Sequence, residues 1–240
     1  MMLTALFVEF RKLKGSLALV LCLIAPALVA ILMALICLRQ PAMSWTLVLT
    51  ETTGLWSFFV LPMTVTALSI LLAQIEHAPR AWDHILALPI PRWHLFAAKS
   101  AMMIILIAVM SILLAVDVRI AGALLAFWDP ARAATGGFSW ELAARLLGNI
   151  WMTSWFMGML QLWVALCFRS FVVPLTLGLG GTFVAVATFG GHEAMFVPWA
   201  MPVSLLTKDV ARAALAIQMG LLGGMLTFAM MLIHLSRREI

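Results

Sequence analysis

The segment Glu76–Lys99, EHAPRAWDHILALPIPRWHLFAAK, is a mixed-charge stretch between two long apolar runs. It gathers three of the chain's five histidines, together with the three basic residues Arg80, Arg92 and Lys99. The rest of the chain consists of membrane-length apolar runs and short connections. This segment is therefore the best candidate in the sequence for contact with a water-soluble partner.

The composition of the 240 residues excludes a water-soluble globule. The chain is 65% hydrophobic and only 10% charged, whereas soluble domains are about 45–50% apolar and about 25% charged. The net charge of +5 does not predict nucleic-acid binding, because the basic residues form no stripe or block and fit topology signals of a membrane protein. The three cysteines lie in or at the ends of apolar runs without CxxC spacing, which predicts neither disulfides nor a metal site.

Six apolar runs approach the length of about 20 residues that a membrane-spanning helix needs. They are residues 16–38, 52–73, 100–116, 146–168, 171–189 and 213–233. The third is short and ends before Asp117 and Arg119, with an extension through 120–127 as the alternative. The predicted fold class is an all-α polytopic membrane protein with six transmembrane helices.

The N-terminal residues 1–14 have apolar side chains at helical spacing and several charges. This pattern predicts an amphipathic helix lying in the membrane interface. The alternative is the charged region of a cleaved signal sequence, but the apolar run that follows continues to Leu38, so an uncleaved span is expected.

The distribution of Lys and Arg predicts the orientation. An even number of spans puts both termini on one side, and that side holds nine of the fifteen basic residues. Because positive charge is enriched in cytoplasmic loops, both termini are predicted to be cytoplasmic.

Two of the expected outer connections carry local signals. Ser139, with Glu141 two residues later, predicts the start of a helix. The connection 190–212 contains an apolar core punctuated by two prolines, in the pattern Pro198-Trp199-x₂-Pro202. It is too short to span the membrane and too apolar for an exposed loop, so a segment that re-enters the outer leaflet is expected, with a surface-lying helix as the alternative.

The last run contains a G-x-x-x-G pair, Gly220 and Gly224, which lets two helices approach closely. Packing within one subunit is expected here rather than a seam between two subunits.

Motifs for chemistry are absent from the sequence. There is no P-loop and no H-E-x-x-H, and His77, His84 and His94 are separated by prolines, so no metal site is predicted. The spans themselves contain no carboxylate near mid-membrane, where an ion-coupled transporter would be expected to carry one. The chain is therefore not expected to be an enzyme by itself, and the energy for any transport would come from another subunit.

Residues 79–88 are predicted to form a short helix. Pro79 suits a first helical position and Pro89 ends the stretch. Trp82, Ile85 and Leu86 share one face of this helix. Another face carries Arg80, Asp83, His84 and Ala87. Such a helix is expected to lie on the membrane surface with a protein-facing side, followed by Arg92 and Lys99 at the headgroups; a lipid-facing helix without a partner is the alternative.

This pattern resembles the ABC-2 permeases, and more narrowly their lantibiotic-immunity and antibiotic-peptide-export branch. The matching residues are Glu76, Arg80, Trp82, Leu86, Leu88, Pro89, Ile90, Arg92, Lys99, Pro198, Trp199 and Pro202. The layout of the whole chain fits, while the distinctive motif covers about a tenth of it.

The resemblance implies one type V exporter-like transmembrane domain over residues 1–240. Its parts would be an elbow helix (1–14), two spans (16–73), a cytoplasmic coupling segment (74–99), two further spans (100–168) and a final pair (171–233) that encloses the re-entrant segment 190–212. It also implies two copies of a separate ATP-binding subunit that carries ATP and Mg²⁺, and a second permease that is identical or related. The residues expected to contact the ATPase are Glu76, Arg80, Trp82, Asp83, Ile85, Leu86, Pro89 and Arg92.

The expected function is the permease subunit of an ABC exporter in the bacterial cytoplasmic membrane. A largely apolar interior suits a hydrophobic or amphipathic substrate, such as a peptide antibiotic or a lipid-like molecule. Two alternatives remain from the sequence: a membrane scaffold or assembly factor that transports nothing, and an ion-coupled transporter.

Overall fold

The computed structural model describes residues 2–77, 91–207 and 209–237. Within these ranges the chain is helical and contains no strand; its β-type pairing is a single bridge between Ser44 and Thr135. The prediction of an all-α polytopic membrane protein is confirmed at this level. Half of the expected coupling segment 74–99, residues 78–90, lies outside the described residues.

The helices follow the apolar runs of the sequence. In chain order they are α1 (Met2–Leu13), α2 (Leu17–Cys37), α3 (Trp45–Leu55), η1 (Trp56–Val60), α4 (Leu61–His77), α6 (Arg92–Trp128), η2 (Pro130–Arg132), α7 (Trp140–Cys167), α8 (Val172–Ala187), η3 (His192–Phe196), α9 (Met201–Ser204) and α10 (Val210–Arg237). Five passages among the described residues are long and apolar enough to cross a membrane: α2, the continuous stretch α3–η1–α4, α6, α7 and α10. Helix α8 is apolar but has only 16 residues, so the count of six spans stays a prediction.

Serine side chains define the starts of three helices. Ser16, Ser44 and Ser139 each accept a hydrogen bond from the backbone N–H three residues later, at the beginning of α2, α3 and α7. An accepting side chain at this position satisfies one of the N–H groups that a helix start leaves without a partner. The start predicted at Ser139 is therefore present, and α7 begins about one and a half turns before the apolar run 146–168.

A π-helical turn interrupts the passage between α3 and α4. At η1 the N–H of Leu61 bonds to the carbonyl of Trp56, five residues back. Pro62 follows directly; it has no N–H, and its ring would clash with the carbonyl of Phe58 in a regular α-helix. The wider turn relieves that clash while the chain stays helical from Trp45 to His77. The sequence interpretation did not anticipate this turn.

Helix α6 extends past both ends of the expected short third span. It has 37 residues, or about 55 Å of helix, against a hydrocarbon core of about 30 Å. Lys99 and Arg119 lie twenty residues apart on it, which is about 30 Å, so one charge lies at each boundary of the apolar part. The short span 100–116 is thus replaced by one continuous helix that includes Asp117 and Arg119.

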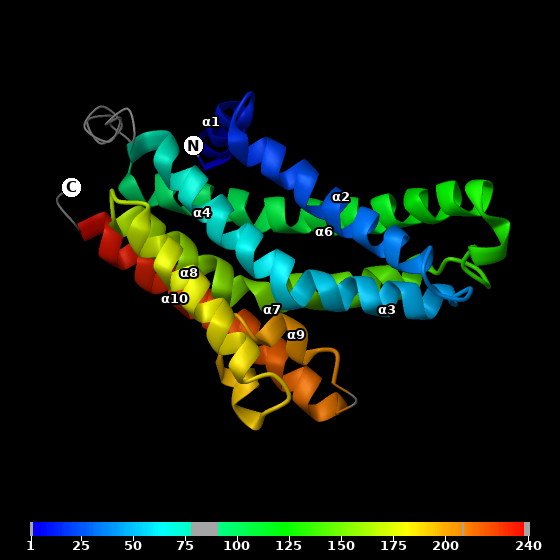
Figure 1. The fold of residues 1–240 in the computed structure, drawn as a ribbon. Coiled ribbons are helices and arrows are strands. Elements are labelled where there is room, and N and C mark those ends of the chain that lie inside the picture. The colour runs from blue at the N-terminus through cyan, green and yellow to red at the C-terminus, as the bar shows by residue number, and fades with distance from the viewer. Residues whose placement is uncertain (1, 78–90, 208, 238–240) are drawn as a thin grey trace.

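The helices diverge from one shared end (Figure 1). The N-terminus, α1, the end of α4, the start of α6 and the end of α10 lie together there, while the connections after α2 and after α6 meet at the far end and α9 lies at a third corner. The far-end connections are tied by backbone bonds: the Trp45 N–H donates to the Thr135 carbonyl at 3.1 Å, and the Thr135 N–H donates to the Met43 carbonyl at 2.8 Å. Both described chain ends therefore lie on one side, which an even number of crossings requires.

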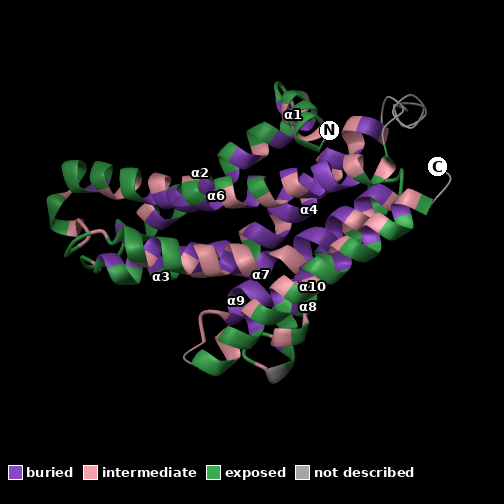
Figure 2. Cartoon of the chain, turned by 180° about the vertical axis from the view of Figure 1, so that it is seen from behind, coloured by how far each residue is buried: buried purple, intermediate pink, exposed green. Residues whose placement is uncertain are grey.

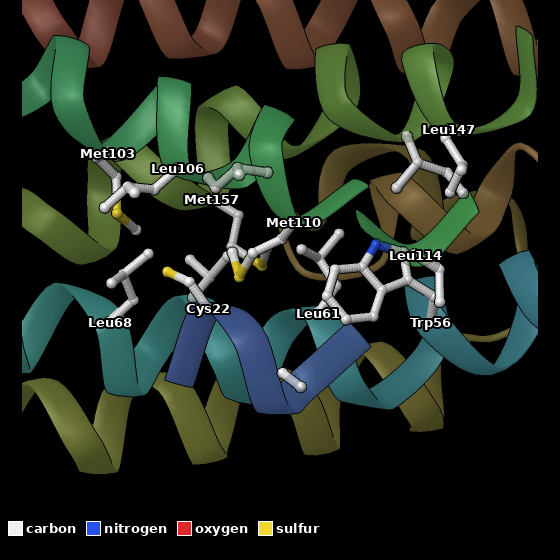
Figure 3. Packing of buried hydrophobic residues seen from close by; sticks show 14 of the residues in the cluster. Cys22, Trp56, Leu61, Leu68, Met103, Leu106, Met110, Leu114, Leu147 and Met157 are labelled. Carbon is white, nitrogen blue, oxygen red and sulfur yellow. The ribbon is translucent and has the colours of Figure 1, made fainter. Parts of the chain in front are cut away.

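The core lies where α2, α4, α6 and α7 meet, and Figure 2 shows their buried faces turned toward each other. Figure 3 places Cys22 of α2, Leu68 of α4, Met110 of α6 and Met157 of α7 side by side, and all four are almost fully buried. The outward faces are also apolar. Large exposed examples are Leu23, Ile24, Phe183 and Leu222. In a membrane these faces would contact lipid, so burial here depends on helix packing rather than on exclusion of water.

Helices α10 and α7 approach closely through the glycine pair. A Cβ atom on Gly220 would lie 2.6 Å from the Cα of Thr153, and one on Gly224 would lie 2.8 Å from the Cβ of Trp155. Both contacts fall within a single chain. The glycines therefore let the two helix backbones meet at a distance that any side chain would prevent.

Replacing Gly220 by alanine is expected to destabilise the protein. The added methyl group meets the backbone of Thr153, and overpacking of this kind costs about 1–3 kcal/mol, more than the gain in helix propensity of up to about 1 kcal/mol. The matched control is Gly148→Ala in α7, where a Cβ would meet nothing within 4 Å. Thermal midpoints in detergent should fall for Gly220→Ala and stay level or rise for Gly148→Ala; equal midpoints for the two variants would contradict the packing described.

Candidate functional site

Four charged side chains, three of them buried, form a cluster at the shared end, which we call the ion network: Glu9, Lys12, Glu76 and Lys99. The Nζ of Lys99 lies 2.7 Å from Glu9 Oε2 and 2.9 Å from Glu76 Oε2. The Nζ of Lys12 lies 2.5 Å from Glu9 Oε1 and 2.9 Å from Glu76 Oε1. Each ammonium group thus bridges both carboxylates, and the network joins three helices.

The three helices place these charges next to residues 78–90. Glu76 lies in the last turn of α4, the helix that precedes residues 78–90. Lys99 lies two turns into α6, the helix that follows them. Glu9 and Lys12 are three residues apart on α1, so they share one face of that helix. The network therefore connects both flanks of residues 78–90 to the N-terminal helix.

The network is electrically neutral, and three of its four side chains are buried while Lys12 is 28% exposed. The side chains of Glu76 and Lys99 are 2% and 3% exposed, and Lys99 also donates a hydrogen bond to the Leu72 carbonyl at 3.2 Å. Removing charges from water is costly, and only close opposite charges with good hydrogen bonds offset that cost. Two carboxylates and two ammonium groups meet this requirement as a set, so the loss of any one leaves a buried charge without compensation.

Helix α1 lies outside the membrane-length helices, and both of its charges have displaced pKa values. Burial raises the pKa of Glu9, but the charge of Lys99 and hydrogen bonds from Lys12 and Lys99 outweigh it and lower that pKa overall. Burial lowers the pKa of Lys12, but the hydrogen bond to Glu9 and the charge of Glu76 outweigh it and raise that pKa overall. Both shifts favour the charged forms, which is what the network needs.

The end of α4 has a second set of ties. Gln74 donates a hydrogen bond to the Arg169 carbonyl at 3.2 Å, in the turn between α7 and α8, and His77 Nε2 lies 3.3 Å from the Ala165 carbonyl of α7. The residues just before 78–90 are therefore bonded to α1, α6, α7 and the α7–α8 turn.

The structure describes two of the residues expected to contact an ATPase, Glu76 and Arg92. Glu76 belongs to the ion network, and Arg92 is the half-buried first residue of α6. The others lie outside the described residues, so their role stays a prediction: Arg80, Trp82, Asp83, Ile85, Leu86 and Pro89.

The depth of Lys99 relative to the headgroups stays a prediction, but its side chain does not extend to the protein surface. Its side chain is turned inward and paired, because two carboxylates from other helices are available to it there. The partners Glu9 and Lys12 were also missed as site residues. Their spacing of three residues on one helix face was a signal, but the 64 residues between Lys12 and Glu76 hid the partner.

The segment that was expected to re-enter the membrane is sheltered by neighbouring helices. Trp199 is buried, and its ring occupies the place where Gly181 of α8 lacks a side chain, since a Cβ there would lie 2.3 Å from the indole. Pro202 is buried in α9 and Pro198 is partly exposed. Helix α9 packs against α7 and α10. Shelter of this kind is what a non-spanning backbone at membrane depth requires; its depth in the bilayer stays a prediction.

Among the described residues, no group of three or more His, Cys, Asp or Glu side chains could hold a metal ion. The chemistry available at the network is therefore charge pairing and its transmission between helices.

The family model described as "ABC-2 family transporter protein" matches residues 5–185, well over half of the chain. The chain is also similar to the cobalt transport protein CbiM of Sorangium cellulosum (strain So ce56), at 33% identity over 95 residues. That alignment covers 40% of this chain and 41% of CbiM, so the chain spans less than half the length of this relative. The matched family region contains all four residues of the ion network.

Replacing Lys99 by methionine is expected to destabilise the fold. It leaves the carboxylates of Glu9 and Glu76 with Lys12 alone, and breaking a buried ion pair from one side costs about 3–5 kcal/mol. Thermal midpoints in detergent should fall strongly for Lys99→Met and little for Lys14→Met, which removes an exposed lysine nearby. Adding Glu76→Gln to Lys99→Met should restore part of the loss; strictly additive losses would argue against a coupled network.

The contribution of Glu9 to stability should depend on pH in one direction. Its pKa is lowered in the folded state, so its stabilising effect is complete above its ordinary pKa of about 4.3 and is lost as the pH falls through the lower folded value. The pKa of Lys12 is raised in the folded state, so the stabilising effect of Lys12 is lost only as the pH rises above about 10.4. The difference in thermal midpoint between the native chain and Glu9→Gln should thus be constant from about pH 6 to 9 and shrink toward pH 3. A difference that stays unchanged down to pH 3 would show that the Glu9 charge is not what stabilises the site.

Proposed function

We infer that this chain, which belongs to the ABC-2 family of transporter proteins, is the membrane-spanning permease subunit of an ABC exporter driven by a separate ATP-binding subunit. The family is a membrane transport component and not itself catalytic. The observation that carries the finer proposal is the ion network, which fixes both flanks of residues 78–90 to each other and to α1. A segment that must pass on a force needs rigid attachments on both sides.

In this proposal residues 79–88 dock on the ATPase. Trp82, Ile85 and Leu86 would supply the apolar contact surface, and the charged residues of the segment would lie at its rim. Apolar anchors surrounded by a polar rim are the usual arrangement of protein interfaces. ATP binding would close two ATPase subunits and displace the segment.

The displacement would pass into the membrane through the network and then along α4. A shift of Glu76 acts on Lys99 of α6 and on both charges of α1, because the paired atoms are at most 2.9 Å apart. Helix α4 continues into the π-helical turn at η1, where a wider, weaker hydrogen-bond pattern gives a place for the passage to bend. Motion at the end that carries the ion network would thereby change the access of substrate at the opposite end of the molecule.

The proposal includes a second permease, identical or related, because one such chain forms half of a translocation path. The apolar outward faces of α2 and α8 are compatible with lipid or with such a partner. The proposed location is the bacterial cytoplasmic membrane with both termini in the cytoplasm, and the proposed substrates are hydrophobic or amphipathic molecules such as peptide antibiotics or lipid-like compounds.

The double variant Trp82→Ala with Ile85→Asp tests the docking. Co-purified with its ATP-binding subunit, the variant is expected to lose most of the ATPase association and of ATP-driven export, because it removes an anchor and buries a charge in the contact. The matched control is Trp128→Ala with Phe127→Asp, the same kinds of change at exposed positions at the far end of α6, and it should keep ATPase association.

Survival of both association and export in the Trp82–Ile85 variant would refute the coupling assignment. Loss of ATPase association in this variant, together with a native complex that transports no substrate, would favour the scaffold. Transport that persists without ATP and collapses with the proton gradient would favour the ion-coupled transporter.

A further inference from the structure

A groove opens between α2, the α3–η1 junction and α9, at the end of the molecule that lies far from the ion network. Its volume is about 590 Å³, within the range of small-molecule sites. Its walls are mostly apolar: Met33, Ile36, Met43, Leu47, Leu55, Phe58, Phe189, Val203 and Leu206. The remaining lining residues are Gln40, Glu51 and Gly54.

Each of two facing walls carries one polar side chain in the groove. Helix α2 runs toward the far end and Gln40 follows it in the turn, while α3 runs back from that end and carries Glu51. The apolar side chains of Met43 and Leu47 line the groove on the side of the far end, and Phe58 lies seven residues deeper than Glu51. The polar groups therefore have apolar walls on both sides.

Glu51 is the one ionisable side chain among the residues that line the groove. It is exposed, and no described cation forms an ion pair with it. A single negative charge between low-dielectric walls focuses its field into the groove and raises the local concentration of cations.

The deep end of the groove lies at the π-helical turn. Phe58 belongs to η1 and meets Phe189 edge to face, with ring centroids 5.1 Å apart. Turns of this type are frequent at functional sites because they redirect side chains out of the regular helical register. Here the turn lines the apolar end of the groove with an aromatic pair.

We propose that this groove binds a cationic amphiphile, with an ammonium or guanidinium group beside Glu51 and an apolar body against Met33, Phe58 and Phe189. The charge of Glu51 selects the cation, and the deeper side chains of Met33, Phe58 and Phe189 hold the apolar part toward the membrane interior. Calling this molecule the transported substrate rests on the proposed permease function; its binding does not require the ATPase.

Binding is measured on the purified full chain, without ATPase, in an uncharged maltoside detergent. The probe is a dansyl group carried on an alkylammonium chain, and the corresponding dansyl alcohol is the uncharged control; energy transfer from tryptophan reports binding. Glu51→Gln is expected to weaken binding of the ammonium probe at least about tenfold, the lower end of the range of a lost hydrogen bond to a charged group, and to leave the alcohol nearly unchanged. Glu141→Gln, which removes an exposed carboxylate at the same end outside the groove, should bind both probes like the native chain.

A charge reversal gives an independent test. Glu51→Lys should bind an alkyl sulfate probe more tightly than the native chain does and the ammonium probe more weakly. Equal ammonium affinity in the native chain and Glu51→Gln, an equal loss in Glu141→Gln, or no preference of the native chain for the ammonium over the alcohol would each overturn the proposal.

The two proposals fail separately. Loss of ammonium binding in Glu51→Gln together with intact ATPase association in the Trp82–Ile85 variant would keep the groove as a cation site and remove the coupling assignment. Intact ammonium binding in Glu51→Gln, together with lost ATPase association in the Trp82–Ile85 variant, would keep the coupling assignment and remove the groove as a cation site.

Discussion

The burial of Lys99 between two carboxylates from other helices is the constraint on which the shared end of the structure depends. An ammonium group that is 3% exposed is tolerable only where opposite charges surround it. Helices α1, α4 and α6 must therefore meet in one arrangement, because sliding any of them by a turn would separate a charge from its partners. This requirement holds the N-terminal helix, which is too short to be stable alone, and sets how α4 and α6 enter the membrane.

Polarity at the two ends of the molecule is organised in opposite ways. At the shared end the ion network holds its four charges paired and neutral as a set. At the far end Glu51 stays unpaired by any described cation and faces an open groove. Paired charges resist motion and suit the transmission of force, whereas an open charge can accept a ligand. The structure thus separates a rigid end from a receptive end, and the continuous passage from Trp45 to His77 connects them.

The all-α class, the apolar runs and the helix start at Ser139 could be predicted from sequence because they depend on local composition and on one capping side chain. The ion network could not, because its pairs join residues 64 and 90 positions apart and nothing near Lys99 distinguishes an inward lysine from an interfacial one. The turn at η1 was also missed, since Pro62 permits either a kink or a wider turn and the packing around Trp56 decides. The docking residues 79–88 all lie outside the described residues, so the resemblance alone supports their role.

The excess length of α6 has a consequence for the lipid environment. Beyond Arg119 the helix continues with exposed apolar side chains, among them Leu124 and Phe127. Its surface therefore stays apolar past Arg119, which lies at one boundary of a bilayer of ordinary thickness. A thicker membrane would cover these side chains and would also submerge Arg119 unless its long side chain reached the headgroups. The cost of hydrophobic mismatch at the far end would therefore fall on Arg119.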